Sequence, residues 1–166
     1  LMQVVMTLAG VFYLGIPTGC LIRMRAANDG LVWLLLVFAL TWGTDTFAYV
    51  GGRLWGKTLL APQISPKKTL EGAVVGVIGG TVSGLLILLV SQKFTPGLIP
   101  LLVIGPFVAI LGDLVESWLK RAFGVKDSHI VGLNILPGHG GVLDRVDALI
   151  LVATFSYVYL HLMGLP

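Results

Sequence analysis

Carboxylates are the side chains of this sequence that could most directly do chemistry, because the 166-residue chain has only eight of them. Asp113 and Glu116 lie three positions apart, which places both on one face of a helix, with Ser117 beside them. Two carboxylates in such a position repel each other, and a bound divalent cation would remove the repulsion. The alternative is an acid pair at the membrane surface that Lys120 and Arg121 neutralise.

A second polar cluster lies at residues 136–147, where three glycines surround His139. This pattern indicates a tight loop whose backbone approaches another group closely. Asp144 and Asp147, again three apart, are predicted to lie in the first turn of the last helix. Carboxylates there also suit the positive end of a helix, which is the structural alternative. Arg145, between them, could pair with an acid or hold a phosphate through two hydrogen bonds.

A third group of polar side chains is the run Ser-Pro-Lys-Lys-Thr-Leu-Glu-Gly at residues 65–72. Ser65 followed by Pro66 predicts the start of a helix, with the proline at its first position. Lys67 and Lys68 would oppose the helix dipole there, so we predict that they bind an anion. The alternative is that both lysines only mark the cytoplasmic side of a membrane protein.

Asp45 lies well inside an apolar segment, where a carboxylate costs about 2.5–3.5 kcal/mol on insertion scales. Such residues normally face the interior of a helix bundle or a water-filled cavity. We therefore predict that Asp45 lines a polar cavity. The alternative is an acid that pairs with a basic neighbour for structural reasons.

The composition indicates which fold must position these groups. Hydrophobic residues make up 56% of the chain and charged residues 11%, and the mean hydropathy is +0.95. An average soluble domain has about 25% charged residues, so we predict an all-α integral membrane protein with about five transmembrane helices. The expected spans are residues 2–22, 31–51, 72–90, 98–119 and 148–163. The glycines predicted to pack against a neighbouring helix are Gly76, Gly79, Gly80 and Gly84.

The connections between the spans differ in length and charge. Residues 52–71 and 120–147 form two long polar loops, whereas residues 23–30 and 91–97 form short ones. With five spans the long loops share one side of the membrane, and they hold eight of the eleven basic residues. The positive-inside rule places that side in the cytoplasm.

Three further expectations come from charge, cysteine content and the first residues. A net charge of +3 without a basic run argues against nucleic acid as a partner. Cys20 is the single cysteine, which rules out an internal disulfide. The chain opens on Leu1 without the features of a signal peptide. We expect one transmembrane domain, residues 1–166, that is part of a longer protein.

Taken together, these motifs resemble the signature of CDP-diacylglycerol synthases, also called phosphatidate cytidylyltransferases. The resemblance covers residues 42–147, and the spacer at residues 128–135 is longer than in the family pattern. The residues that carry it are Asp45 with Ala48-Tyr49, residues 65–72, Gly112-Asp113, Glu116 to Arg121, Lys126-Asp127 and residues 136–147.

The resemblance implies the C-terminal catalytic part of an enzyme that converts CTP and phosphatidate, a membrane lipid, into CDP-diacylglycerol and pyrophosphate. The expected location is the bacterial inner membrane, and a homodimer is compatible with the family. It implies Mg2+, with room for a second ion, held by Asp113 and Asp144, with Glu116 and Asp147 as weaker candidates. The expected catalytic residues are Lys120, Arg121, Lys126, His139 and Arg145. Those expected to bind substrate are Asp45, Ser65, Lys67, Lys68, Glu71, Ser117, Gly140 and Gly141.

Two other classes of protein stay open. A CTP-dependent polyprenol kinase would also need polar loops and magnesium, but its neutral nucleophile should require a base near the metal. A transporter with Asp45 and Asp113 as coupling acids would place them near the midplane, often at internal repeats, whereas these acids gather towards one face. The Asp-Gly-x-x-Ala-Arg motif of CDP-alcohol phosphotransferases is absent from the sequence.

Overall fold

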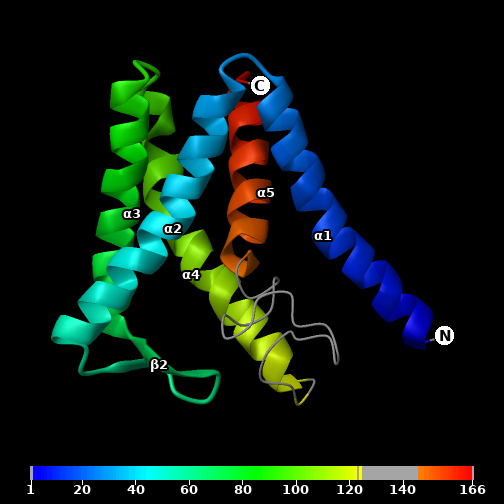
Figure 1. Cartoon of the computed structure of the whole chain (residues 1–166), viewed down its shortest axis with the longest axis vertical. Helices are drawn as coiled ribbons and strands as arrows, with labels where there is room; N and C mark the ends of the chain where they lie inside the picture. The colour runs from blue at the N-terminus through cyan, green and yellow to red at the C-terminus, as the bar shows by residue number, and fades with distance from the viewer. Residues whose placement is uncertain (1, 123, 125–145, 166) are drawn as a thin grey trace, which may run out of the picture.

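The computed structural model describes residues 2–122, 124 and 146–165, and it is mostly helical, as the sequence predicts (Figure 1). A short two-stranded sheet interrupts the helices. The elements in chain order are α1 (Met2–Ala26), α2 (Gly30–Trp55), β1 (Leu59–Ala61), β2 (Ser65–Thr69), α3 (Leu70–Val90), the 3-10 helix η1 (Pro96–Leu98), α4 (Ile99–Ala122) and α5 (Asp147–Leu162).

Three segments of the described chain are long and apolar enough to cross a bilayer: α2, α3 and Pro96–Ala122, which includes α4. Many of their exposed side chains are large and apolar, for example Val82 on α3 and Phe107 on α4. Such a surface is the expected exterior of a bundle in lipid. Helix α5 is apolar but has 16 residues, and at about 1.5 Å per residue it is shorter than the hydrocarbon core. That α1 and α5 also cross the membrane stays a prediction.

Glycine lets α2 and α3 pack closely. A Cβ atom on Gly76 would lie 2.8 Å from the Cβ of Ala48 and 2.9 Å from the carbonyl oxygen of Thr44. Either distance is too short, so a side chain here would push the two helices apart. The predicted packing role of the α3 glycines is confirmed, since the same kind of contact with α2 side chains occurs at Gly79, Gly80 and Gly84.

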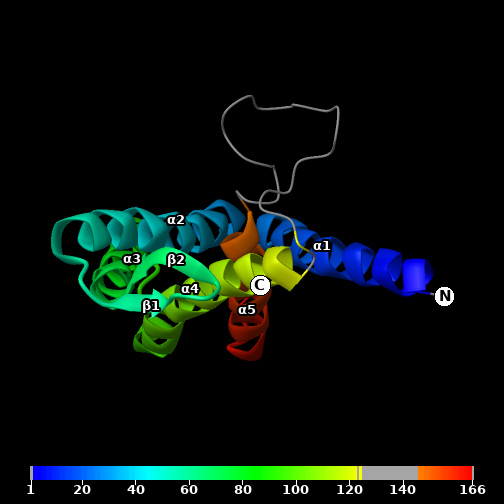
Figure 2. The same cartoon turned by 90° about the horizontal axis from the view of Figure 1, so that it is seen from below.

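The core lies where α2, α4 and α5 meet. Leu40 of α2, Leu102 of α4 and Val152 of α5 are all buried in one apolar cluster. Helix α1 packs on α5 and α2 through its C-terminal half, where Arg23 donates a hydrogen bond to the Tyr157 hydroxyl at 3.3 Å. Its N-terminal half extends away from the bundle (Figures 1 and 2). The sequence therefore builds a compact unit from α2 to α5, with α1 attached at one end.

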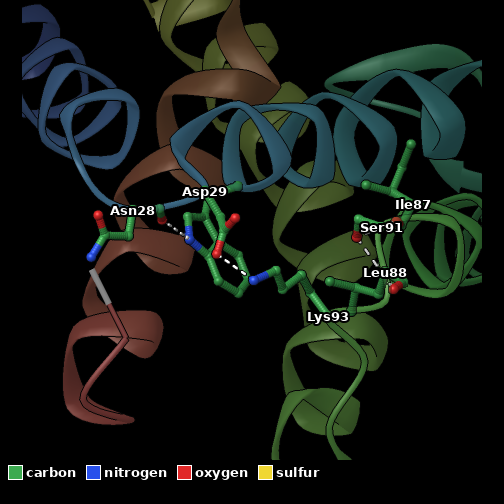
Figure 3. A network of polar contacts seen from close by, with 7 residues as sticks. Asn28, Asp29, Ile87, Leu88, Ser91 and Lys93 are labelled. Atoms are coloured by element: carbon green, nitrogen blue, oxygen red, sulfur yellow. Dashed lines mark hydrogen bonds and ion pairs between the residues drawn. The ribbon is translucent and has the colours of Figure 1, made fainter.

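The two short connections meet at one end of the bundle. Lys93, which follows α3, places its ammonium 2.5 Å from the carboxylate of Asp29, which precedes α2. Figure 3 shows this contact beside Asn28, whose carbonyl accepts a hydrogen bond from the Trp33 indole at 3.1 Å. The two short connections therefore lie at the same end of the bundle, and that they share one side of a membrane stays a prediction.

The hairpin β1–β2 and the C-terminal end of α4 lie at the opposite end (Figure 1). Arg121, in the last turn of α4, donates a hydrogen bond to the carbonyl of Ile64 in the hairpin at 3.4 Å. Seen from this end, both strands lie against α2, α3 and α4, whereas α1 points away (Figure 2). The hairpin end is therefore where polar segments distant in sequence converge.

The predicted helix start at Ser65 and Pro66 is wrong. Residues 65–69 form β2, which pairs antiparallel with β1 through Leu59 opposite Thr69 and Ala61 opposite Ser65. The helix begins at Leu70, where the Thr69 hydroxyl accepts a hydrogen bond from the Gly72 amide at 3.2 Å. Thr69 is a better cap because the strand before it keeps Lys67 and Lys68 out of the unfavourable first turn.

Candidate active site

A cavity of about 520 Å3 opens at the hairpin end of the bundle. Four elements enclose it: α2, the hairpin, the first turn of α3, and α4. The wall is apolar where Ala48, Leu60 and Ile110 contribute. Its polar and charged lining consists of Asp45, Tyr49, Arg53, Ser65, Lys67, Lys68, Thr69 and Asp113. The cavity thus combines acidic groups from helices with basic groups carried mainly by a strand.

An ion pair between Lys68 and Asp113 joins the hairpin to α4 inside this cavity. The side chains are 23% and 31% exposed, and the lysine nitrogen itself is shielded from solvent. The charges of both partners act on Asp45, whose side chain lines the same cavity. Asp45 therefore faces a cavity that holds charged groups, and Asp113 faces the same cavity.

A third carboxylate belongs to the same electrostatic group. Asp147 is the first residue of α5, as predicted, and its side chain accepts a hydrogen bond from the Ala148 amide at 2.7 Å. The charges of Asp113, Asp45 and Lys68 all act on it. The close approach of α4 to α5 at Gly112 explains this, because a Cβ on Gly112 would lie 2.9 Å from the Cα of Ala148. Carboxylates from α2, α4 and α5 thus influence one another electrostatically, and two of them, Asp45 and Asp113, line the cavity.

Arg53 is a cavity residue that the sequence analysis missed. Its guanidinium donates a hydrogen bond to the Tyr49 hydroxyl at 3.2 Å, which orients it along the cavity wall. Asp45, Tyr49 and Arg53 are spaced four residues apart, so they lie on one face of α2. Extending the face that carries Asp45 by two turns could have identified both residues.

Glu71 has a different position from the one expected. It is not among the residues that line the cavity. Its carboxylate accepts hydrogen bonds from the backbone amides of Lys57 at 3.1 Å and Thr58 at 3.1–3.2 Å. The Leu70 amide in turn donates to the Thr58 carbonyl at 2.9 Å. Glu71 therefore fixes the segment between α2 and β1 against the start of α3.

The second carboxylate of α4 is directed to another partner. Glu116 is buried, and one of its oxygens lies 2.6 Å from the ammonium of Lys120, one turn further along the helix. Neither residue lines the cavity, and neither does Ser117. Asp113 and Glu116 thus share a helix face but pair with different lysines.

Six of the expected site residues lie outside the described residues: Lys126, His139, Gly140, Gly141, Asp144 and Arg145. In the part of the chain that the structure describes, no three Asp, Glu, His or Cys side chains are close enough together to form a metal site alone. Asp45 and Asp113 nevertheless face one cavity. This is the number of carboxylates with which proteins commonly hold Mg2+ when substrate phosphates and water supply the other ligands.

The fold and the cavity define a helical membrane protein with an acidic and basic site at one end of the bundle, a combination suited to phosphate groups and a divalent cation. The chain belongs to the Cytidylyltransferase family, whose family model matches residues 1–163. The resemblance found in the sequence motifs is thereby confirmed.

Curated relatives are similar over most of this chain. A phosphatidate cytidylyltransferase of Brucella abortus biovar 1 is 42% identical over 153 residues, which cover 91% of this chain and 55% of that protein. A phosphatidate cytidylyltransferase of Bacillus subtilis is 42% identical over 162 residues, which cover 95% of this chain and 58% of that protein. Another, from Staphylococcus saprophyticus, is 43% identical over 154 residues, which cover 91% of this chain and 56% of that protein. The chain spans about half the length of the curated relatives it matches.

Proposed function

We propose that this chain carries the catalytic part of a phosphatidate cytidylyltransferase, which transfers a cytidylyl group from CTP to phosphatidate. Family membership and the names of the relatives support the reaction. The structural observation that carries the proposal is the cavity in which Asp45 and Asp113 face Arg53, Lys67 and Lys68. Cations there would bind phosphate oxygens, and the carboxylates would bind a divalent cation.

The chemistry asks for positioning and charge neutralisation more than for a base. An oxygen of the phosphatidate phosphate forms a bond to the α-phosphorus of CTP, and the bond from that phosphorus to the β-phosphate oxygen breaks. The products are CDP-diacylglycerol and pyrophosphate. The nucleophile is already an anion, so the barrier comes from bringing negative groups together. Arg53, Lys67 and Lys68 line the cavity and would neutralise part of that charge.

We propose Mg2+ as the cofactor, with Asp113 and Asp144 as its first ligands and Glu116 and Asp147 as further candidates, and a second ion is compatible with the site. When bound, the ion would neutralise and orient the reacting phosphates. Asp113 fits this role because it lies in the cavity. Asp147 is close enough to interact with its charge. Glu116 fits it less well, since it pairs with Lys120 outside the cavity wall.

The hairpin end is proposed to face the cytoplasm of a bacterial cell, where CTP is made. The described basic residues support this orientation. The hairpin end carries Arg53, Lys57, Lys67, Lys68, Lys120 and Arg121. The opposite end carries only three described basic residues, Arg23, Arg25 and Lys93, so the hairpin end is the more positive one. The apolar part of the cavity wall would then accept the beginning of the lipid chains. A homodimer stays an expectation from the family.

Pyrophosphate release from CTP and phosphatidate tests the proposal, using the purified chain in detergent micelles with and without Mg2+. We expect release that needs both substrates and Mg2+, and that Asp113→Asn lowers by at least about a hundredfold. Asp29→Asn is the matched control, because Asp29 forms a comparable ion pair at the opposite end of the bundle. Release of CDP with a phosphorylated lipid alcohol would instead identify a CTP-dependent kinase. Equal loss in both variants would refute a specific role for the cavity.

A further inference from the structure

Lys68 is distinguished from the other basic residues of the cavity by the position of its ammonium. The nitrogen is shielded from solvent, and its ion-pair partner is Asp113. Lys67, the preceding residue of β2, lines the same cavity but is exposed. The difference lies in the contact of Lys68 with α4, where Asp113 is its partner. The two lysines therefore form a natural pair for comparison.

The surroundings of Lys68 are acidic. Asp45 of α2 and Asp147 of α5 both interact with the Lys68 charge as well as with Asp113. A buried ammonium is costly unless opposite charge compensates it, and here Asp113 pairs with it directly while Asp45 and Asp147 add to the negative field. A carboxylate with this surrounding charge would also attract a divalent cation. The ammonium and the cation would thus compete for Asp113.

We propose that Lys68 occupies the cation-binding position at Asp113 before nucleotide arrives, and that it transfers to a substrate phosphate when the metal takes over Asp113. The inference rests on the proposed function, because it takes the anion to be a phosphate group. Lys68 then has two successive partners, a carboxylate and a phosphate. If the exchange takes place, the metal binds weakly to the protein alone and strongly together with the nucleotide.

The fold allows this exchange by movement of one side chain. The backbone of β2 is held on one side by its pairing with β1 and at its end by the Thr69 cap of α3. Lysine has a flexible four-carbon stem and three rotatable donors, so its nitrogen can move while Cα stays in place. Lys67 and Arg53 line the same cavity, so a phosphate drawn there would lie within reach of Lys68.

Mn2+ binding to the whole chain in detergent micelles, without nucleotide, tests the proposal. The loss of the free Mn2+ signal in electron paramagnetic resonance measures the dissociation constant. We expect Lys68→Met to bind Mn2+ on the order of fivefold to tenfold more tightly than the unsubstituted chain, because a competing positive charge is gone. Lys67→Met is the matched control and should change the constant by less than about twofold.

Two further variants separate charge from side-chain size. Lys68→Arg keeps the positive charge, so its Mn2+ affinity should stay as weak as that of the unsubstituted chain. Asp113→Asn should weaken binding in every background, including Lys68→Met. Circular dichroism of each variant checks that the helices are intact. These variants keep the inference testable even where one of them folds poorly.

A nucleotide arm tests the second half of the exchange. Addition of a non-hydrolysable CTP analogue should tighten Mn2+ binding to the unsubstituted chain more than to Lys68→Met, because only the former gains a lysine–phosphate contact. The inference is overturned if Lys68→Met binds Mn2+ no more tightly, if Lys67→Met gains as much, or if none of the chains binds Mn2+. Tighter Mn2+ binding by Lys68→Met, together with an unsubstituted chain that releases no pyrophosphate from CTP and phosphatidate, would support the ion-pair inference and contradict the proposed function.

Discussion

The carboxylate of Glu71 accepts hydrogen bonds from the backbone amide of Thr58 through both of its oxygens, at 3.2 and 3.1 Å. Lys57 donates a further bond at 3.1 Å. One side chain therefore holds the beginning of the hairpin against the first turn of α3. The strand that follows carries Lys67 and Lys68 into the cavity, so Glu71 is placed to position residues it does not touch.

We expect Glu71→Ala to raise the KM for the anionic substrates by roughly tenfold, because the hairpin loses three hydrogen bonds to a charged acceptor. The kcat at saturating substrate should fall much less, since no group in contact with substrate has been removed. Steady-state kinetics of pyrophosphate release measures both constants.

Glu71→Gln is the conservative control, because an amide oxygen can still accept one or two of these hydrogen bonds. The KM of Glu71→Gln should therefore stay close to that of the unsubstituted chain. A direct contact of Glu71 with substrate would give the opposite pattern, with both variants losing kcat to a similar extent.

We expect replacement by alanine to destabilise the protein at Gly76 of α3 but not at Gly19 of α1. Gly76→Ala places a Cβ 2.8 Å from the Cβ of Ala48, so it should destabilise the α2–α3 pair by about 1–3 kcal/mol. Gly19→Ala is the matched control, because no atom lies within 4 Å of its Cβ position and alanine favours a helix. Thermal unfolding in detergent, followed by circular dichroism, should show a lower Tm for Gly76→Ala alone. Equal Tm values would mean that α2 and α3 can separate without cost.

The helices and the glycine packing could be predicted from the sequence, because long apolar segments with few charges have one stable arrangement in a membrane. The start of α3 could not. Ser65-Pro66 is a good helix start by local preference, but Thr69 with Gly72 is another, and the pairing of β2 with β1 favours the later one. The residues around Ser65 alone could not show which start is used, because the choice depends on pairing with β1, which lies across a turn from β2.

The candidate site was predictable in part for a related reason. Asp45 and Asp113 stand out because an acid within an apolar helix is costly. The lysine that pairs with Asp113 does not stand out, since Lys67 and Lys68 cannot be distinguished in the sequence until the fold places Lys68 against α4. Arg53 was missed because a basic residue at the end of an apolar segment is ordinary in membrane proteins. Its importance comes from the α2 face it shares with Asp45.

The ion pair between Asp29 and Lys93 should contribute little to stability, although it joins two connections. Its side chains are 43% and 40% exposed, so water screens the attraction. We expect a coupling free energy below about 1 kcal/mol from a double-mutant cycle with Asp29→Asn and Lys93→Met, measured by chemical denaturation. Asparagine is chosen because Asp29 has a φ of 58°, a conformation that asparagine tolerates. A coupling of several kcal/mol would show that this end of the bundle is drier than its exposure indicates.

Arg53 is expected to bind a substrate phosphate, since it lines the cavity and its guanidinium is oriented by the Tyr49 hydroxyl. Arg53→Gln should raise the KM for CTP or phosphatidate by roughly tenfold, because a charged donor to phosphate is lost. Tyr49→Phe should have a smaller effect of the same sign, since it only releases the guanidinium. Arg25→Gln, at the opposite end of the bundle, is the control and should leave both KM values unchanged. If Arg53→Gln and Arg25→Gln alter pyrophosphate release equally, Arg53 acts through the net charge of the protein and not through a contact in the cavity.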